Sequence, residues 1–456
     1  MSDLDKHCRL RHGLNVHCLA HIFQYLDTAD LYTVGEMSEF YKTIVHDFVI
    51  AKHQINFGNL ERRNIKASQM LERYVTRVRK VILKNFHAEF GFAKFAEWAS
   101  QYCAPDQLKS VISLRESSNS RANVSLPIQF RQVEKLEIYG IHLQLSAHFS
   151  DSLRILKLDH LKLNPDFDWT ELKNLTDLRF RHVKGINAEN FIQLLSQRPK
   201  IEVFHHDIET FEESTQDVCQ AMAKYCGNSI QEYRGEMGNN HKGDNAPGQY
   251  MYHFISKFKN IKTAYLTTYQ ACCGDLIDAI KRLAENDTIQ TLDIMYCGRA
   301  HEKSNCIFHT EPNHLNGDNM KHFSHLKSLK ITWPPTRSYN IRSLYCDHFK
   351  LLAVYGSQIL SNVENLLLTY AQDVWYYSQV PPKLRHLCIN NSLSIEQATM
   401  ILAALNVTLQ KRNNGQITDD FIKIIVWTKY NYDLFNGLIG PDGDSIKIVY
   451  SFSYGF

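Results

Sequence analysis

The sequence predicts an α/β protein. A small three-helix unit at the N-terminus is followed by a curved repeat array, with parallel strands on its concave face and helices on its convex face. Three observations predict this architecture. Apolar residues in the first fifty positions recur at helical spacing, and a Leu-x-x-Leu-x-Leu type pattern then returns about every 20 to 37 residues. Amphipathic segments with helix-capping residues separate many of the copies.

Residues 10–50 are expected to form three short helices. The apolar residues of the first helix fall at i, i+3, i+4 and i+7, and they are Leu19, Ile22, Phe23 and Leu26. Leu31 and Val34 mark the second helix, and the apolar residues from Met37 to Phe48 mark the third. A unit this small closes only a minimal core, so its remaining apolar side chains are expected to dock on something else.

The same segment resembles an F-box. That family's pattern has a Leu-Pro pair, then a Leu, an Ile-Phe pair, a Leu, an Asp-Leu pair and later Val and aromatic positions. The matching positions are Leu14, Leu19, Ile22-Phe23, Leu26, Asp30-Leu31, Val34 and Phe40. Asn15 stands where the family usually has Pro, and His17 where it usually has Glu, so the turn that presents Leu14 is less pre-set here.

The F-box resemblance implies binding to the Skp adaptor, which links the chain to a cullin and to the ubiquitin-conjugating machinery. The adaptor-binding residues it implies, shared between the small core and the adaptor face, are Leu14, Leu19, Ile22, Phe23, Leu26 and Leu31. An ordinary three-helix bundle and a DNA-reading helix-turn-helix are the alternatives. The DNA reader is disfavoured because the third helix sets Lys42 and Lys52 among acidic residues.

Residues 51–77 are interpreted as a basic helical connector. The steepest charge run of the chain, at 61–84, has eight Lys and Arg residues against two Glu. Interleaved apolar residues such as Met70 and Val78 favour a folded segment with a solvated basic face over an RNA-binding or acidic-partner patch.

Residues 78–456 are expected to hold the repeats and a closing strand near 446–452. The clearest copies of the pattern begin at Val133, Leu153, Leu175, Ile289, Leu326, Val363 and Leu384. Between copies, helices are expected, and the best marked of them opens with a Ser-x-x-Gln capping box at Ser394 and Gln397. Strands that alternate with helices at this spacing pair in parallel, because a parallel return needs a crossover of a dozen or more residues.

This region resembles degenerate leucine-rich repeats. F-box proteins with such repeats form a known family, in which the repeat solenoid captures a protein substrate. The position that normally holds Asn is occupied here by Ile141, Leu161, Val183 and Pro334, and only Cys297 matches. The side-chain ladder that usually satisfies the loops is therefore expected to be absent.

The strand residues between the buried leucines should point to the concave face, which is the candidate substrate-binding surface. The residues chosen for it are Lys157, Arg179, Arg181, Tyr265, Trp333, Tyr370 and Trp427. Arg, Trp and Tyr are frequent anchors of protein interfaces. An acidic or phosphorylated substrate segment suits Arg179 and Arg181, and generic solvated positions are the alternative.

Composition limits the classes of partner. The net charge is +3, so nothing in the overall balance calls for a nucleic acid or a membrane partner. The start of the chain is acidic and lacks an apolar run typical of a secretory signal, and no apolar stretch approaches the ~18 residues of a bilayer span. The odd number of cysteines, 11, fits reduced thiols. We therefore expect a cytoplasmic and/or nuclear protein.

No catalytic site, cofactor or metal is predicted. One insertion carries possible zinc ligands at Cys297, His301, Cys306, His309 and His314, but their spacing matches no strong signature. Cys272 and Cys273 have no assignable His and acid partners, and the Gly-rich loop at 235–243 lacks a phosphate-binding motif. A metal protein or enzyme built around the insertion stays an alternative.

The sequence therefore predicts a non-catalytic substrate receptor of a Skp, cullin and F-box ubiquitin ligase. Such a receptor binds the adaptor through the N-terminal helices and a protein substrate through the repeats, and so promotes ubiquitination of that substrate. A stand-alone leucine-rich-repeat scaffold without a ligase role is the alternative, motivated by Asn15 and His17.

Overall fold

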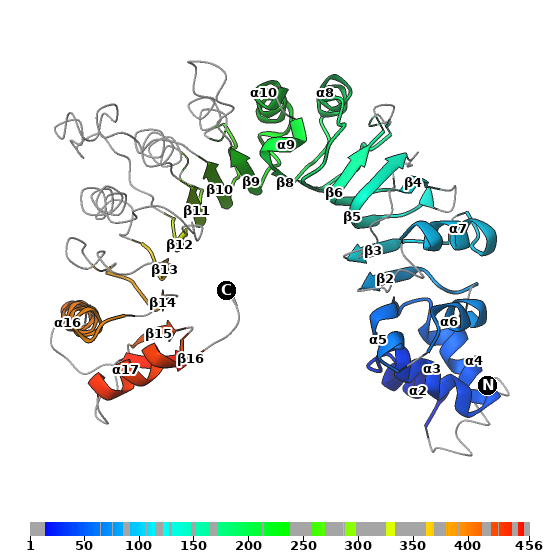
Figure 1. The fold of residues 1–456 in the computed structure, drawn as a ribbon, viewed down its shortest axis with the longest axis horizontal. Helices are drawn as coiled ribbons and strands as arrows, with labels where there is room; N and C mark the ends of the chain where they lie inside the picture. Colours follow the sequence, from blue (N-terminus) through cyan, green and yellow to red (C-terminus); the bar gives the residue numbers. More distant parts are fainter. Residues whose placement is uncertain are drawn as a thin grey trace. The chain divides into compact units, whose positions relative to one another are not determined.

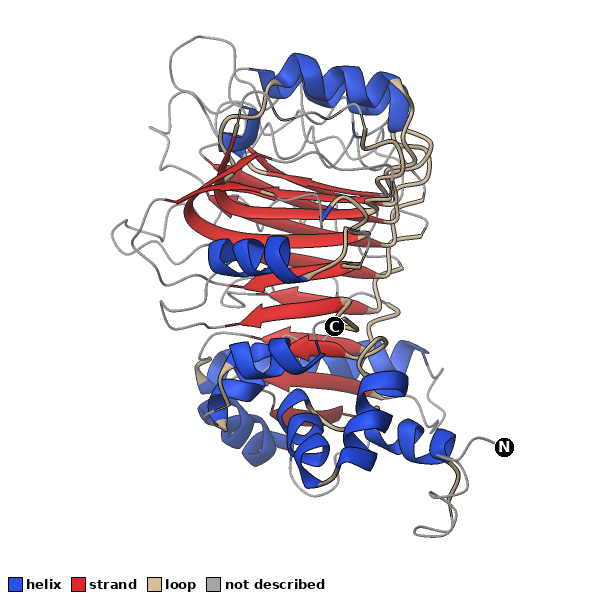
Figure 2. Cartoon of the chain, turned by 90° about the vertical axis from the view of Figure 1, so that its right-hand side faces the viewer, coloured by secondary structure: helices blue, strands red, loops and turns tan. Residues whose placement is uncertain are grey.

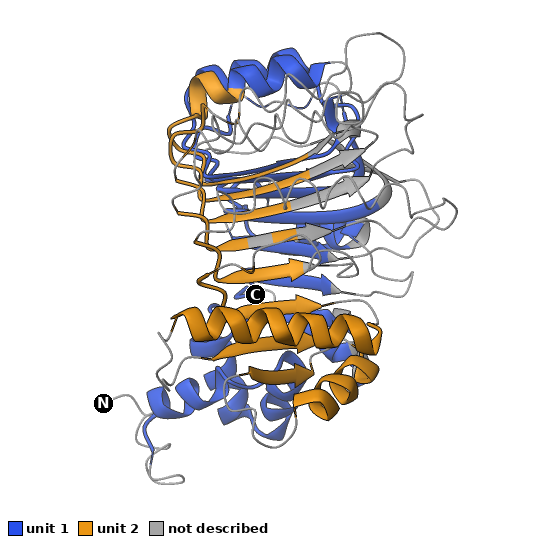
Figure 3. Ribbon diagram, turned by 90° about the vertical axis from the view of Figure 1, so that its left-hand side faces the viewer, with its two compact units in different colours: residues 1–221 blue, residues 222–456 orange. Residues whose placement is uncertain are grey.

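The computed structural model divides into two compact units, residues 1–221 (unit 1) and residues 222–456 (unit 2), which Figure 3 shows in different colours. The residues described are 14–63, 65–74, 76–84, 92–105, 107–114, 122–126, 130–146, 152–164, 167, 169, 171–211, 214–237, 255, 257–269, 286, 288–297, 325–332, 362–368, 380, 382–389, 393–412, 421–426, 428–439 and 446–450. Each unit contains parallel strands together with helices, which confirms the α/β class.

Unit 1 begins with three short α-helices and one π-helical turn. These elements are α2 (Val16–Phe23), α3 (Thr28–Met37), α4 (Glu39–Ile44) and η1 (Val45–Val49). The side chains of Asn15, Asp27 and Ser38 cap the three α-helices by accepting a backbone N–H three residues further on. The cap at Ser38 ends α3 at Met37, so Met37 belongs to the second helix and not, as predicted, to the third.

The segment expected to be a helical connector contains two helices and also the first strand. These elements are β1 (Gln54–Asn56), α5 (Phe57–Arg62) and α6 (Ala67–Tyr74). Its arginines reach acids of the preceding helices, and the pairs are Arg63–Asp30, Arg73–Glu36 and Arg77–Asp47. These three arginines contact the N-terminal helices, while the side chains of Arg63 and Arg77 stay 54 and 46% exposed.

The strands of unit 1 pair in parallel and in the order of the chain, with one short strand beside the end of β5. They are β1, β2 (Lys80–Lys84), β3 (Ser110–Leu114), β5 (Lys135–Ser146), β6 (Ile155–Leu163), β7 (Asp177–Arg181) and β8 (Val203–His206), with β4 (Ala122–Ser125) paired to β5. Equivalent apolar residues stand in register from strand to strand, as Leu136, Leu156 and Leu178 do. All three are fully buried, as the repeat pattern predicts.

The helices of unit 1 cover one side of these strands. They are α7 (Phe92–Tyr102), α8 (Ala188–Ser196), α9 (Ile208–Phe211) and the first part of α10 (Thr215–Cys226). Figure 1 shows α7 and α8 on the same side of the strands. Aromatic rings fill the layer between helix and strand, where Phe191 of α8 packs against Phe180 and Phe204.

Unit 2 repeats this arrangement. Its parallel strands are β9 (Glu232–Met237), β10 (Thr263–Tyr269), β11 (Thr291–Cys297), β12 (Ser328–Thr332), β13 (Asn365–Leu368), β14 (His386–Ile389), β15 (Ile422–Val426) and β16 (Ile446–Tyr450). Its helices are α16 (Ile395–Arg412) and α17 (Lys429–Ile439). The capping box is confirmed, because Ser394 and Gln397 exchange backbone-to-side-chain hydrogen bonds of 2.8 and 3.2 Å. The expected closing strand is β16.

A different ladder replaces the missing Asn ladder, and it lies before the strands. In unit 1, the carbonyl oxygen of Arg154 accepts the backbone N–H groups of Thr176 and Asp177, and it accepts the Thr176 hydroxyl as well. The backbone part of this pattern recurs in unit 2, where the Lys262 oxygen accepts the N–H groups of Gln290 and Thr291. Just before these residues, the Thr288 hydroxyl donates to the Ile261 oxygen over 2.6 Å. Figure 2 shows these loops at one edge of the strands. The backbone groups in the loops before neighbouring strands thus form hydrogen bonds with each other, without the Asn that usually occupies this repeat.

Candidate protein-interaction surfaces

Helix α2 leaves an apolar face exposed, which we call the α2 apolar face and define by Leu14, Ile22 and Tyr25. Their exposed fractions are 37, 49 and 79%. Ile22 lies within α2, whereas Leu14 comes just before the N-cap of this helix and Tyr25 just after its C-cap. Large apolar side chains exposed together are typical of a surface that binds another protein.

The structure divides the predicted adaptor-binding residues between core and surface. Leu19, Phe23 and Leu31 are buried, and the Phe23 ring meets Tyr41 edge to face with centroids 5.8 Å apart. Leu14 and Ile22 are exposed. Leu26 is half-buried. The three buried residues hold the small core, so within the described helices only the exposed members can meet a partner directly.

Two exposed residues were missed by the sequence reasoning. Tyr25 follows the C-cap of α2, in the turn that leads to the next helix. Met37 is 68% exposed at the end of α3, where the cap at Ser38 turns the chain. Met37 is exposed because it is the last residue of α3, whereas the sequence analysis placed it at the start of the third helix.

Asn15 fixes the start of α2 in place of the proline usual in an F-box. Its side-chain oxygen accepts the backbone N–H of Cys18 over 2.8 Å. An Asn cap stabilises a helix start by about 1 kcal/mol relative to Ala. His17, the other departure, packs edge to face against Phe48 of η1 with centroids 5.6 Å apart. Asn15 thus fixes the start of α2 by a hydrogen bond, and the exposed His17 contacts η1 through its ring.

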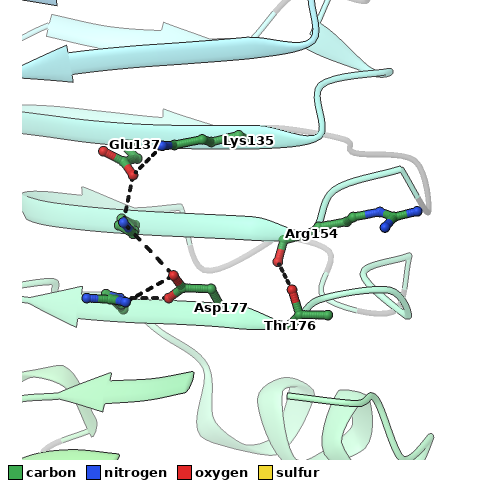
Figure 4. A network of polar contacts seen from close by, with 7 residues as sticks. Lys135, Glu137, Arg154, Thr176 and Asp177 are labelled. Carbon is green, nitrogen blue, oxygen red and sulfur yellow. Dashed lines mark hydrogen bonds and ion pairs between the residues drawn. The ribbon is translucent and has the colours of Figure 1, made fainter. Parts of the chain in front are cut away.

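On the strand face opposite the buried leucines, unit 1 carries a charged ladder. Its members, shown in Figure 4, are Lys135, Glu137, Lys157, Asp177 and Arg179. Glu137 lies 3.2 Å from the Lys135 ammonium and 2.7 Å from that of Lys157. Asp177 receives two hydrogen bonds from the Arg179 guanidinium, of 2.7 and 3.1 Å. Cations and anions thus alternate across β5, β6 and β7.

The charged ladder compensates itself. The side chains of Glu137 and Asp177 are only 16% exposed, so their charges lie where solvent screens them poorly. Burial works to raise the pKa of Glu137, but hydrogen bonds and attraction from Lys157 and Lys135 outweigh it, and the net shift is downward. Two predicted substrate-binding residues, Lys157 and Arg179, are therefore already engaged by acids. The hypothesis that an acidic substrate binds Arg179 loses its support.

The carboxyl ends of β6 and β7 bring two histidines together. The rings of His160 and His182 lie 4.4 Å apart, and each ring approaches a carboxylate, His160 that of Asp159 at 2.5 Å and His182 that of Asp207 at 3.6 Å. The side chain of Arg181, another predicted contact residue, is 62% exposed and 3.9 Å from Asp159. Arg181 is thus the loosest of the three predicted basic contacts in unit 1.

In unit 2, only one predicted contact residue can be placed. Tyr265 is half-buried on β10, in register with Arg234 and Asp293, and Asp293 pairs with Lys330 at 2.9 Å. The other predicted residues, Trp333, Tyr370 and Trp427, lie outside the described residues.

No described group is arranged for metal binding or thiol chemistry. The hypothetical zinc ligands His301, Cys306, His309 and His314 lie outside the described residues, and among those described no cluster of three or more His, Cys, Asp or Glu is placed to hold a metal. Burial raises the pKa of Cys103, Cys226 and Cys388 to about 12, so these thiols stay protonated. Cys272 and Cys273 also fall outside the described part of the chain.

The chain was compared with known proteins at the level of sequence. In the part of the chain that is described, no helix has the length and apolar character needed to cross a membrane. No protein-family model matches the chain, and a search of curated proteins finds no significant match.

Proposed function

We propose that the chain is a substrate-recognition subunit of a Skp, cullin and F-box ubiquitin ligase. In this proposal the N-terminal helices are an F-box that binds the Skp adaptor, and the parallel strands with their helices are a degenerate leucine-rich-repeat solenoid that binds a protein substrate. The observation that carries it is the α2 apolar face, exposed on a closed small core in a segment with F-box spacing.

The packing of unit 1 supports this proposal. A receptor has to hold its adaptor-binding helices and its strands in a fixed relation. Within unit 1, β1 follows the helices directly and pairs with β2, while Arg63 reaches Asp30 of α3 over 2.8 Å. The Thr28 hydroxyl accepts the backbone N–H of Asn56 over 2.8 Å, which links the start of α3 to β1. These contacts couple the helices to the first strands.

A receptor of this kind performs no chemistry itself. It recruits a substrate, and the ubiquitin-conjugating machinery reached through the cullin modifies it. The proposal includes residence in the cytoplasm or nucleus, where that machinery works.

Co-purification with the Skp adaptor and the cullin tests the proposal. The full chain should bind, and the variant Leu14→Ala/Ile22→Ala should lose adaptor affinity by about tenfold or more, because truncating interface anchors costs ~2 kcal/mol or more. Both side chains are exposed, so the variant should keep its melting temperature. The matched control is Leu438→Ala/Val407→Ala, which truncates two exposed apolar residues of unit 2.

Failure of the folded full chain to bind the adaptor would overturn the receptor role. Equal loss in the control variant would show that the α2 apolar face is not the binding surface. In the first case, the alternative of a stand-alone leucine-rich-repeat scaffold would apply.

A further inference from the structure

The last three strands of unit 2 bring three basic side chains side by side. His386 of β14 is in register with Lys423 of β15, and Lys423 with Lys447 of β16. Arg385 precedes His386, and its carbonyl oxygen accepts the backbone N–H of Lys423 over 2.8 Å. We call His386, Lys423 and Lys447 the basic row. Neighbouring strands are ~4.8 Å apart, so its charges are spaced closely.

The basic row has no acidic partner among the described residues. No described carboxylate lies within 4.0 Å of Arg385, Lys423 or Lys447, whereas Lys330 two strands away is paired with Asp293. The Lys447 ammonium lies 4.2 Å above the ring of Phe421. Asn365 accepts a hydrogen bond from the Nδ1 of His386 at 2.6 Å. Among the described residues, therefore, no carboxylate within 4.0 Å offsets the charge of Lys423 or Lys447.

An apolar row runs beside the basic row on the same face. Side chains two residues apart on a strand share a face, so Ile425 follows Lys423 and Val449 follows Lys447. Ile425 and Val449 are in register and half-buried. The opposite face holds Ile424, which is fully buried. The surface therefore offers positive charge and, one step along the strands, partly exposed aliphatic groups.

We propose that this surface of β14, β15 and β16 binds an extended acidic protein segment in which carboxylates and apolar residues alternate at every second position, so that both kinds point to one side of the segment. The carboxylates would meet Lys423 and Lys447, and the apolar residues would cover Ile425 and Val449. In an extended chain, groups two residues apart repeat about every 6.8 Å on one side, which matches the step from one row to the other along these strands.

A nucleic acid fits this surface less well than a peptide. Single-stranded nucleic acids need aromatic rings on which bases stack, next to the cations that hold the phosphates. The aromatic residue beside the basic row, Phe421, is 39% exposed but has the Lys447 ammonium 4.2 Å above its ring, and the neighbouring row is aliphatic. Bases would find aliphatic groups where stacking rings are required.

This proposal goes beyond the receptor role, because an acidic segment can bind whether or not the chain joins a ligase. The further step, that the segment belongs to a substrate marked for ubiquitination, rests on the proposed function. The two are separable, since the α2 apolar face lies in unit 1 and the basic row in unit 2.

Fluorescence anisotropy with a labelled peptide that repeats Glu-Ser-Val-Ser, called the Glu-Val peptide, tests the proposal on the full chain, because its Glu and Val side chains point to the same side. The peptide should bind, and added salt should raise its Kd. The variant Lys423→Glu/Lys447→Glu should raise the Kd by about tenfold or more, since like charges facing a ligand cost affinity. The control variant Lys411→Glu/Lys429→Glu makes the same charge change on α16 and α17 and should bind as the parent does.

Three results would overturn the proposal. They are no binding of the Glu-Val peptide by the parent, an equal loss in the control variant, and tighter binding of a single-stranded oligonucleotide than of the peptide. A Gln-Val peptide should bind much more weakly, and equal binding would show that charge is not what the surface recognises. Adaptor co-purification with Lys423→Glu/Lys447→Glu should be unchanged, which keeps this test distinct from that of the receptor role.

Discussion

The outward faces of β5 to β7 in unit 1 and of β14 to β16 in unit 2 treat charge in opposite ways. In unit 1, Glu137 sits between Lys135 and Lys157, so the charges of β5 and β6 cancel locally. In unit 2, Lys423 and Lys447 stand side by side without an acid among the described residues. Both surfaces use the same strand positions and both contain lysine. What separates a structural surface from a binding surface is therefore the pairing of the charges and not their number.

The comparison also separates stability from binding. A charge pair with little exposure contributes to folding only while both partners remain, because the survivor is left poorly solvated. An unpaired surface cation contributes little to folding and keeps its charge for a ligand. Charge removal should therefore be costly for stability in unit 1 and costly for binding in unit 2.

Removing both acids of the charged ladder should have the largest effect. The variant Glu137→Gln/Asp177→Asn leaves the ladder with cations alone, and we expect unfolding free energy to fall by about 2–4 kcal/mol. The same variant should gain affinity for the Glu-Val peptide, because its unit 1 face then resembles the basic row. Urea unfolding and anisotropy measure the two effects. Glu171→Gln/Glu202→Gln, which removes two exposed acids of unit 1, is the control and should leave both values unchanged.

Acid should weaken unit 1 through a buried histidine. His206 is 1% exposed, its Nε2 lies 3.8 Å from the Cys219 thiol, and burial lowers its pKa from 6.5 to about 4. The folded state therefore binds this proton less readily than the unfolded state. The stability contribution is complete above pH ~6.5 and is lost as the pH falls toward 4. We expect the melting temperature to drop by about 2–5 °C over that range.

Replacing the histidine isolates its contribution. His206→Leu should flatten the fall in melting temperature between pH 6.5 and 4, whatever its stability at neutral pH. In unit 2, burial and the charges of Lys423 and Arg385 also lower the pKa of His386, but that side chain is only half-buried. His386→Gln should therefore keep most of the fall in melting temperature between pH 6.5 and 4. An unchanged slope in His206→Leu would refute the assignment.

Much of the backbone order was predictable from sequence because it depends on local periodicity. Leu136, Leu156 and Leu178 are buried in register, as their repeat positions require. The apolar positions of α2 were also predictable from their spacing. Sequence alone did not say, however, that Leu19 and Phe23 face inward while Ile22 faces out. That division depends on which helices pack on which side, and this is a property of the assembled unit.

Charge pairing was the part that sequence reasoning misjudged. Arg179 was chosen as a contact residue by its position, yet Asp177, two residues earlier on the same face, engages it. The basic row was missed although Lys423 and Lys447 occupy equivalent strand positions, because register between copies that are 20 or more residues apart has to be known first. Likewise the loop ladder at Thr176 and Thr288 uses no consensus residue, so no motif reveals it.

Truncating one lysine on each face should have the smallest effects on stability and affinity, but the two variants should differ in opposite directions. Lys157→Ala leaves Glu137 with Lys135 as its remaining cation, and we expect a loss of about 1 kcal/mol in unfolding free energy. Lys423→Ala removes a cation that has no acidic partner among the described residues, so its effect should stay within ~0.5 kcal/mol. For the Glu-Val peptide the order should reverse, with Kd rising in Lys423→Ala and unchanged in Lys157→Ala. If both variants changed stability and affinity alike, pairing would not distinguish the two faces.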